Sequence, residues 1–169
     1  TGQSLKRLSS EGACFTNDVV GEEISNMNEA KYFFDEYMRV LDAIHQHGFD
    51  ANLGIKPTAF GLLIDPSKGM ENIRTLVAKA NEHDMFVRLD MEDHRVTTDT
   101  IDVVKALHGE GLTNVGTVLQ GRLHRTLSDI DALETDLGPH ADYRICQGIY
   151  PEPEANAYTG PKALLDGPN

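Results

Sequence analysis

The sequence predicts an α/β fold, namely a partial (β/α)8 barrel of the TIM type with about five parallel strands and four helices. Strand-like and helix-like segments alternate along the chain, and polar residues recur at similar intervals near the strand ends. Such alternation favours βαβ crossovers and hence a parallel sheet, and both a barrel and an open doubly wound sheet fit the spacing. No G-x-G-x-x-G follows the first strand, so the open nucleotide-binding sheet lacks its main evidence. Because the chain has 169 residues and a complete barrel usually has ~250, the predicted barrel is incomplete.

The boundaries of these elements follow from periodicity and capping residues. Short apolar runs predict five strands at residues 13–20, 51–58, 85–92, 114–120 and 142–148. Apolar residues at helical spacing predict four helices at residues 29–47, 71–81, 98–107 and 126–137. Thr98 and Asp99 are the expected cap of the third helix, and Gly48 ends the first. We expect residues 1–169 to form one domain, with an irregular tail at 151–169.

Composition narrows the class of protein. The formal net charge is -12, which argues against nucleic acid as a partner. Two cysteines, Cys14 and Cys146, favour a reducing compartment, and without a C-x-x-C motif no metal site is expected. No apolar run is long enough to cross a bilayer. We therefore expect a cytoplasmic protein, with peripheral contact at a membrane surface as an alternative.

Strand parity predicts a polar interior, because successive side chains of a strand point to opposite faces. In the third strand one face is apolar and the other charged: Val87, Leu89 and Met91 oppose Arg88, Asp90 and Glu92. The other strands repeat this pattern, with polar residues late in each strand, where barrel enzymes place their chemistry. These residues are Lys56, Asp90, Gln120 and Arg144. A purely structural ion pair between Lys56 and Asp90 is the alternative.

Five motifs resemble those of the flavin-dependent proline dehydrogenases. They are Gly21-Glu22 and residues 55–61 (IKPTAFG), 87–93 (VRLDMED), 114–123 (NVGTVLQGRL) and 143–150 (YRICQGIY). The last resembles the family's Arg-Leu-x-Lys-Gly-Ala-Tyr. Their order and spacing match the first five β/α units of that barrel, over most of the chain.

The resemblance implies FAD-dependent oxidation of L-proline to 1-pyrroline-5-carboxylate in proline catabolism, with an electron acceptor such as a quinone. In the catalytic group, Lys56 would hold the proline carboxylate, Asp90 would orient a site tyrosine, and Tyr150 would pack on the substrate ring. Tyr150 could equally be a loop tyrosine beside Pro151. For cofactor binding the resemblance implies Gln120 at the isoalloxazine edge, Arg144 beside the flavin, and Gly148.

Departures from the family pattern leave alternatives open. Gln147 stands where the family usually has Lys, and we expect it to cost an outer ion pair; Ile149 replaces a small Ala and would add bulk if it lines the pocket. The family's last three strands and its paired arginines have no counterpart, so we expect a truncated or split portion that needs a complementing C-terminal half. One alternative is a non-catalytic barrel remnant that acts as an oligomerising interaction module, for example as a homo-oligomer. The other alternative is a different barrel enzyme that acts on a small acid.

Overall fold

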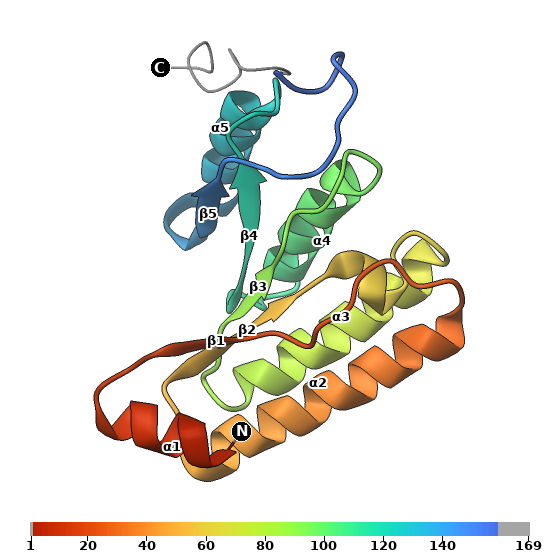
Figure 1. Ribbon diagram of the computed structural model, residues 1–169. Helices are drawn as coiled ribbons and strands as arrows, with labels where there is room; N and C mark the ends of the chain where they lie inside the picture. The colour runs from red at the N-terminus through yellow and green to blue at the C-terminus, as the bar shows by residue number, and fades with distance from the viewer. Residues whose placement is uncertain (1, 159–169) are drawn as a thin grey trace.

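Five parallel strands form one curled sheet in the computed structural model, which describes residues 2–158 (Figure 1). The strands are β1 (Phe15–Asn17), β2 (Ala51–Ile55), β3 (Val87–Leu89), β4 (Val115–Gln120) and β5 (Tyr143–Cys146). Each strand pairs with the next along the chain, so the order in the sheet is β1-β2-β3-β4-β5. The predicted partial barrel is thus confirmed.

Helices connect successive strands, as the sequence predicts. The crossover helices are α2 (Met27–His47), α3 (Pro66–Asn81), α4 (Thr97–Gly109) and α5 (Thr126–Leu137). Two short 3-10 turns, η1 (Pro57–Phe60) and η2 (Gly138–His140), follow β2 and α5. An additional helix, α1 (Gly2–Ser10), precedes the sheet and was not predicted. Figure 1 shows α2 and α3 side by side on the outer side of the sheet.

Capping explains where the helices begin. The Asn26 side chain accepts hydrogen bonds from the backbone N–H groups of Asn28 and Glu29, and Gly48 ends α2 in the left-handed conformation. The predicted start of α3 at residue 71 is wrong. Asp65 caps it by accepting from the Lys68 N–H, and Pro66, whose φ suits a first helical position, begins it.

The start of α4 and the ends of two strands also differ from prediction. Val96, not Thr98 or Asp99, occupies the cap position of α4, so both polar residues lie in its first turn. The strand β2 ends at Ile55 and β3 ends at Leu89, so their late polar residues lie in the loops that follow. Loops after parallel strands begin at the same rim as the strand ends, so these residues still reach the common site.

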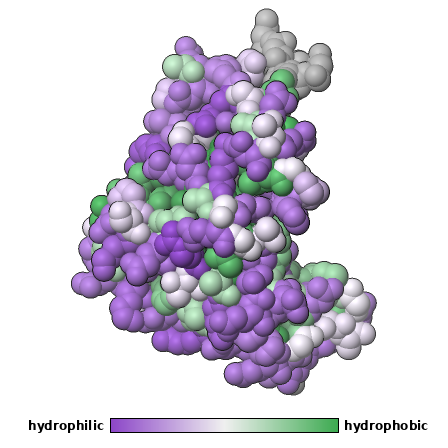
Figure 2. Space-filling model, turned by 180° about the vertical axis from the view of Figure 1, so that it is seen from behind, coloured by the Kyte–Doolittle hydropathy of each residue, from purple (hydrophilic) through white to green (hydrophobic). Residues whose placement is uncertain are grey.

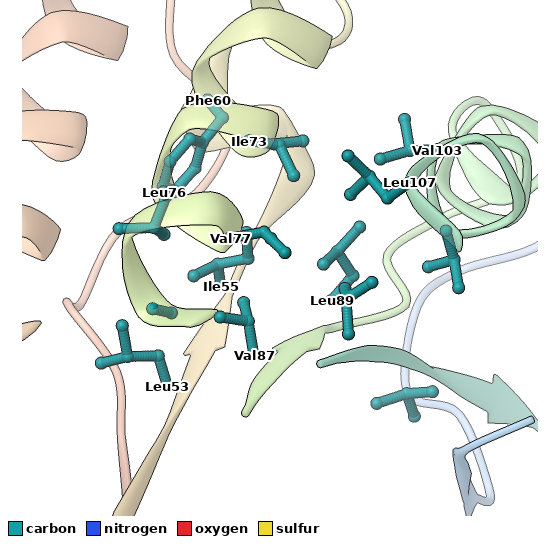
Figure 3. Packing of buried hydrophobic residues seen from close by; sticks show 14 of the residues in the cluster. Leu53, Ile55, Phe60, Ile73, Leu76, Val77, Val87, Leu89, Val103 and Leu107 are labelled. Carbon is teal, nitrogen blue, oxygen red and sulfur yellow. The ribbon is translucent and has the colours of Figure 1, made fainter. Parts of the chain in front are cut away.

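The apolar face of the sheet packs against the helices, as parity predicts. Leu53 and Ile55 of β2, with Val87 and Leu89 of β3, are fully buried. Figure 3 shows them directed toward side chains of η1, α3 and α4, which are Phe60, Ile73, Leu76, Val77, Val103 and Leu107. This layer between strands and helices is the hydrophobic core.

Polar side chains dominate the face of the molecule that lies behind the view of Figure 1. The face seen in Figure 2 is mostly hydrophilic, with hydrophobic residues in small separate groups. Among residues 2–158, none of the helices combines the length and the apolar character that a membrane crossing requires.

Replacing Leu89 by alanine should lower the free energy of unfolding by about 2–5 kcal/mol, because the change leaves a cavity in the core. Leu127 of α5 is 55% exposed, and its replacement by alanine should cost less than about 0.5 kcal/mol. Urea unfolding followed by circular dichroism measures both variants. Equal losses would contradict the placement of Leu89 in the core.

Candidate active site

A pocket of about 250 Å³ lies where the carboxyl ends of β2, β3, β4 and β5 meet. All six residues that the sequence assigns to the site line it, namely Lys56, Asp90, Gln120, Arg144, Gly148 and Tyr150. The structure therefore brings all six together at one rim, and their assignment to the site and their separate roles remain predictions. A polar pocket at the carboxyl rim of parallel strands is the arrangement in which barrel enzymes carry their reactive groups.

Asp90 joins two cations from different parts of the sheet. Its Oδ2 accepts a hydrogen bond from Lys56 Nζ at 3.3 Å, and its Oδ1 accepts one from Arg144 Nη2 at 3.1 Å. The strand β4 separates Asp90, which follows β3, from Arg144 in β5. Its residue Val118 is uncharged and pairs in register with Arg144. Arg144 can therefore extend past β4 to reach the carboxylate on its far side.

The ammonium of Lys56 stays protonated in this setting. Partial burial favours the neutral amine, but the charge and hydrogen bond of Asp90 outweigh burial and raise the pKa of Lys56 above its ordinary value. Glu22 adds to this effect from 3.9 Å. Lys56 is thus a fixed positive charge on the pocket wall, suited to an anionic group such as a carboxylate.

Tyr150 reaches across the mouth of the pocket to the loop after β1. Its hydroxyl donates to Glu22 Oε2 at 2.7 Å. Partial burial, and next this hydrogen bond, raise the pKa of Tyr150, so the hydroxyl remains protonated. In this structure the Tyr150 hydroxyl is therefore held by Glu22, whereas the Asp90 carboxylate accepts hydrogen bonds from Lys56 and Arg144. No motif or periodicity predicted the Tyr150–Glu22 bond.

Gln120 and Gly148 form a close-fitting part of the pocket. Gln120 is 1% exposed and its Nε2 donates to the carbonyl oxygen of Glu92 at 2.7 Å, while its Oε1 is buried and has no hydrogen-bond partner among residues 2–158. A buried acceptor without a donor costs free energy unless a ligand or water supplies one. Gly148 has φ +96°, and a Cβ there would lie 2.3 Å from Gln120 Oε1.

A second polar cluster lies beside the pocket and was not assigned to the site from the sequence. Glu92 Oε2 accepts from the Thr58 N–H at 2.9 Å and its Oε1 accepts from the Thr58 hydroxyl at 2.5 Å. Thr58 Oγ1 in turn accepts from the Glu23 N–H at 2.9 Å. Parity had placed Glu92 on the polar face, and that was the available signal for this cluster.

Glu23 is also held by an arginine from another loop. Arg95, which follows β3, donates to both carboxylate oxygens of Glu23, each at 3.0 Å, and also pairs with Asp93. Glu23 has a positive φ of 39°, which costs free energy for a residue with a side chain. The paired contacts from Arg95 and Thr58 compensate for this cost and fix the loop that carries Glu22.

The two substituted motif positions both border the pocket. Ile149 is 88% exposed and lines it, so the bulk expected from replacing Ala is present at its edge. Gln147 also borders the pocket, whereas parity placed it on the outer side. The difference arises because β5 ends at Cys146 and strand alternation does not continue into the loop.

The fold and the pocket together define a β/α-barrel protein with a charged site at the carboxyl rim of its strands. The family model for proline dehydrogenase matches residues 1–157. The chain belongs to the proline dehydrogenase family.

Relatives support this membership. The chain is 35% identical over 160 residues to a proline dehydrogenase of Deinococcus radiodurans, covering 92% of this chain and 51% of the relative. It is 30% identical over 156 residues to proline dehydrogenase 1 of Bacillus subtilis, covering 92% and 50% respectively. The chain thus spans about half the length of the curated relatives it matches.

Solved structures share the fold. A structure of proline utilization A from Bdellovibrio bacteriovorus, inactivated by N-propargylglycine, superimposes with a TM-score of 0.75 at 20% identity. The match covers 86% of this chain and 18% of that protein. The similarity confirms the arrangement of strands and helices.

Replacing Gly148 by alanine should destabilise the chain more than the same change at Gly111. Both glycines have similar positive φ values, +96° and +88°, so both variants carry a backbone cost of ~1 kcal/mol. Only Gly148 also faces close neighbours, Gln120 and Arg122, which should add ~1–3 kcal/mol. Thermal unfolding of both variants tests this, and equal shifts in Tm would show that the Gly148 contact is not tight.

Proposed function

We propose that this chain supplies the amino-terminal part of an active site that oxidises L-proline to 1-pyrroline-5-carboxylate with FAD. The observation that carries the proposal is the convergence of the six motif residues on one pocket. Membership of the proline dehydrogenase family supports the same reaction.

The residues present fit a flavin. Gln120 Oε1 is a buried acceptor without a donor, and a flavin ring carries an N–H that could serve it. Gly148 keeps the wall free of a Cβ where the backbone must approach closely. Arg144 adds positive charge, which favours a reduced, anionic flavin. We therefore assign Gln120, Arg144 and Gly148 to FAD.

The remaining pocket residues suit the substrate. Proline oxidation removes a hydride and a proton from the ring, and FAD, when bound, accepts the hydride. Lys56 would bind the proline carboxylate through its fixed positive charge. Asp90 keeps Lys56 protonated and in place, which we infer is its main role in this chain. Tyr150, whose hydroxyl is held by Glu22, would pack its ring against the apolar face of proline.

The proposed enzyme needs further parts. Because the chain spans about half of its relatives, we propose that a complementing C-terminal half completes the barrel by pairing with β5, whose second edge is free among residues 2–158. A quinone would take the electrons from the flavin. We place the reaction in the cytoplasm, with contact at a membrane surface where the quinone is reached.

A non-catalytic, oligomerising module is the second candidate. The observation in its favour is the exposed apolar side chain of Ile145 on the free edge of β5, together with Ile149 beyond it. An open strand edge can pair with another copy. Light scattering after size exclusion decides between the candidates for the isolated chain, because a monomer excludes this module.

The direct test is a chimera in which this chain replaces the corresponding half of the Deinococcus radiodurans relative. The folded chimera should hold flavin, seen by its visible absorbance, and proline should bleach that absorbance. A folded chimera that holds no flavin, or whose flavin ignores proline, would reject the proposed function.

Within the chimera, Lys56→Met should raise KM for proline roughly 10- to 100-fold, since hydrogen bonds to charged groups contribute ~1.5–3 kcal/mol. The matched control is Lys105→Met, because Lys105 also forms an ion pair, with Asp136 at 2.8 Å, but lies outside the pocket. Steady-state kinetics with varied proline separate the two. An unchanged KM in the Lys56 variant would remove that residue from substrate binding.

A further inference from the structure

We propose that Glu92 is a positioning residue that sets Lys56 and Gln120 in the pocket. Glu92 does not line the pocket, yet it is hydrogen-bonded to Thr58, which follows Lys56 in the chain, and to Gln120, which lines the pocket. Its carboxylate binds Thr58 and its backbone carbonyl binds the Gln120 amide. The benefit of this placement for catalysis rests on the proposed function, whereas the placement can be tested without it.

The contact with Thr58 fixes the chain segment that carries Lys56. Lys56 is the residue that precedes η1, and Thr58 is the second residue of that turn. Glu92 accepts both the N–H and the hydroxyl of Thr58, so two bonds define the orientation of the turn. Lys56 Nζ then reaches Asp90, which lies two residues before Glu92 on the same loop.

The cluster is buried and its hydrogen-bonding groups are matched. Glu92 is 3% exposed, and Thr58 is also buried. The Thr58 hydroxyl donates to Glu92 and accepts from the Glu23 N–H, so its donor and one acceptor position are used. Burial raises the pKa of Glu92 while the bonds from Thr58 oppose this shift. A buried carboxylate of this kind is costly to leave unpaired, which makes its partners hard to displace.

The same residue reaches the opposite side of the pocket. The Glu92 carbonyl receives the Gln120 Nε2 at 2.7 Å, which fixes the amide and aims the unpartnered Oε1 toward Gly148. The Gln120 backbone is held separately by the Thr126 hydroxyl at 2.5 Å. Movement of Glu92 would therefore release the Lys56 turn and the Gln120 amide together.

Competitive acetylation of lysines on the 169-residue chain, quantified by mass spectrometry, tests the proposal. Thr58→Val removes the hydroxyl and leaves the charge of Glu92 in place, whereas Glu92→Gln removes one of its two carboxylate acceptors. In both variants Lys56 should react at least about fivefold faster, the factor that corresponds to one ordinary hydrogen bond. Thr58→Ser keeps the hydroxyl, so Lys56 should be acetylated in this variant as slowly as in the unaltered chain.

Matched controls separate positioning from general stability. Thr117→Val removes another buried hydroxyl, and Asp129→Asn changes another buried carboxylate, which binds Arg125 on α5. Neither variant should change the ratio of the acetylation rates of Lys56 and Lys105, even if its Tm falls. Faster reaction of all lysines together would indicate unfolding. A Lys56 rate that stays unchanged in folded Thr58→Val and Glu92→Gln chains would overturn the proposal.

Hydrogen exchange on the unaltered chain gives a test that needs no variant. The Thr58 amide and the Gln120 side-chain amide should both exchange slowly in NMR spectra, because both are buried and bonded to Glu92. Rapid exchange of either group would show that Glu92 does not hold it, and would also overturn the proposal.

Discussion

The charge on Asp90 is the constraint on which the pocket depends. Lys56, just after β2, and Arg144, in β5, lie on either side of it, and without an anion between them two positive charges would share one small cavity. Repulsion at such distances is substantial where water is partly excluded. The Asp90 carboxylate replaces this repulsion with one hydrogen bond to each cation, and the bond to Arg144 crosses β4.

The sheet separates stability from chemistry by face. The side toward the helices contains aliphatic residues such as Leu53 and Leu89, which need only volume and burial. The opposite side contains charges whose desolvation must be balanced by partners such as Glu22 and Asp90. The core residues lie within the strands, whereas Lys56 and Asp90 follow directly after them, so packing and charge occupy neighbouring but separate positions of the chain.

Local periodicity was enough to predict the five strands, the four crossover helices and the polar rim, but not helix α1. Lys56 and Asp90 could be placed in one site because equivalent strand positions converge in a parallel barrel. The pairing of Tyr150 with Glu22 could not be predicted, since it joins loops whose conformations depend on tertiary contacts. The early start of α3 was missed because its first turn contains no apolar periodicity, and capping by Asp65 replaces that signal.

The bond from Tyr150 to Glu22 spans 128 positions of the chain and closes the ring of loops around the pocket. Contacts of such long range form late, after the intervening segments have condensed. Glu22 is synthesised well before Tyr150, so the bond between the two loops cannot form until the loop after β5 has also been made. The strand pairs join neighbouring segments and do not depend on this bond, whereas the contact beside the pocket depends on both distant loops.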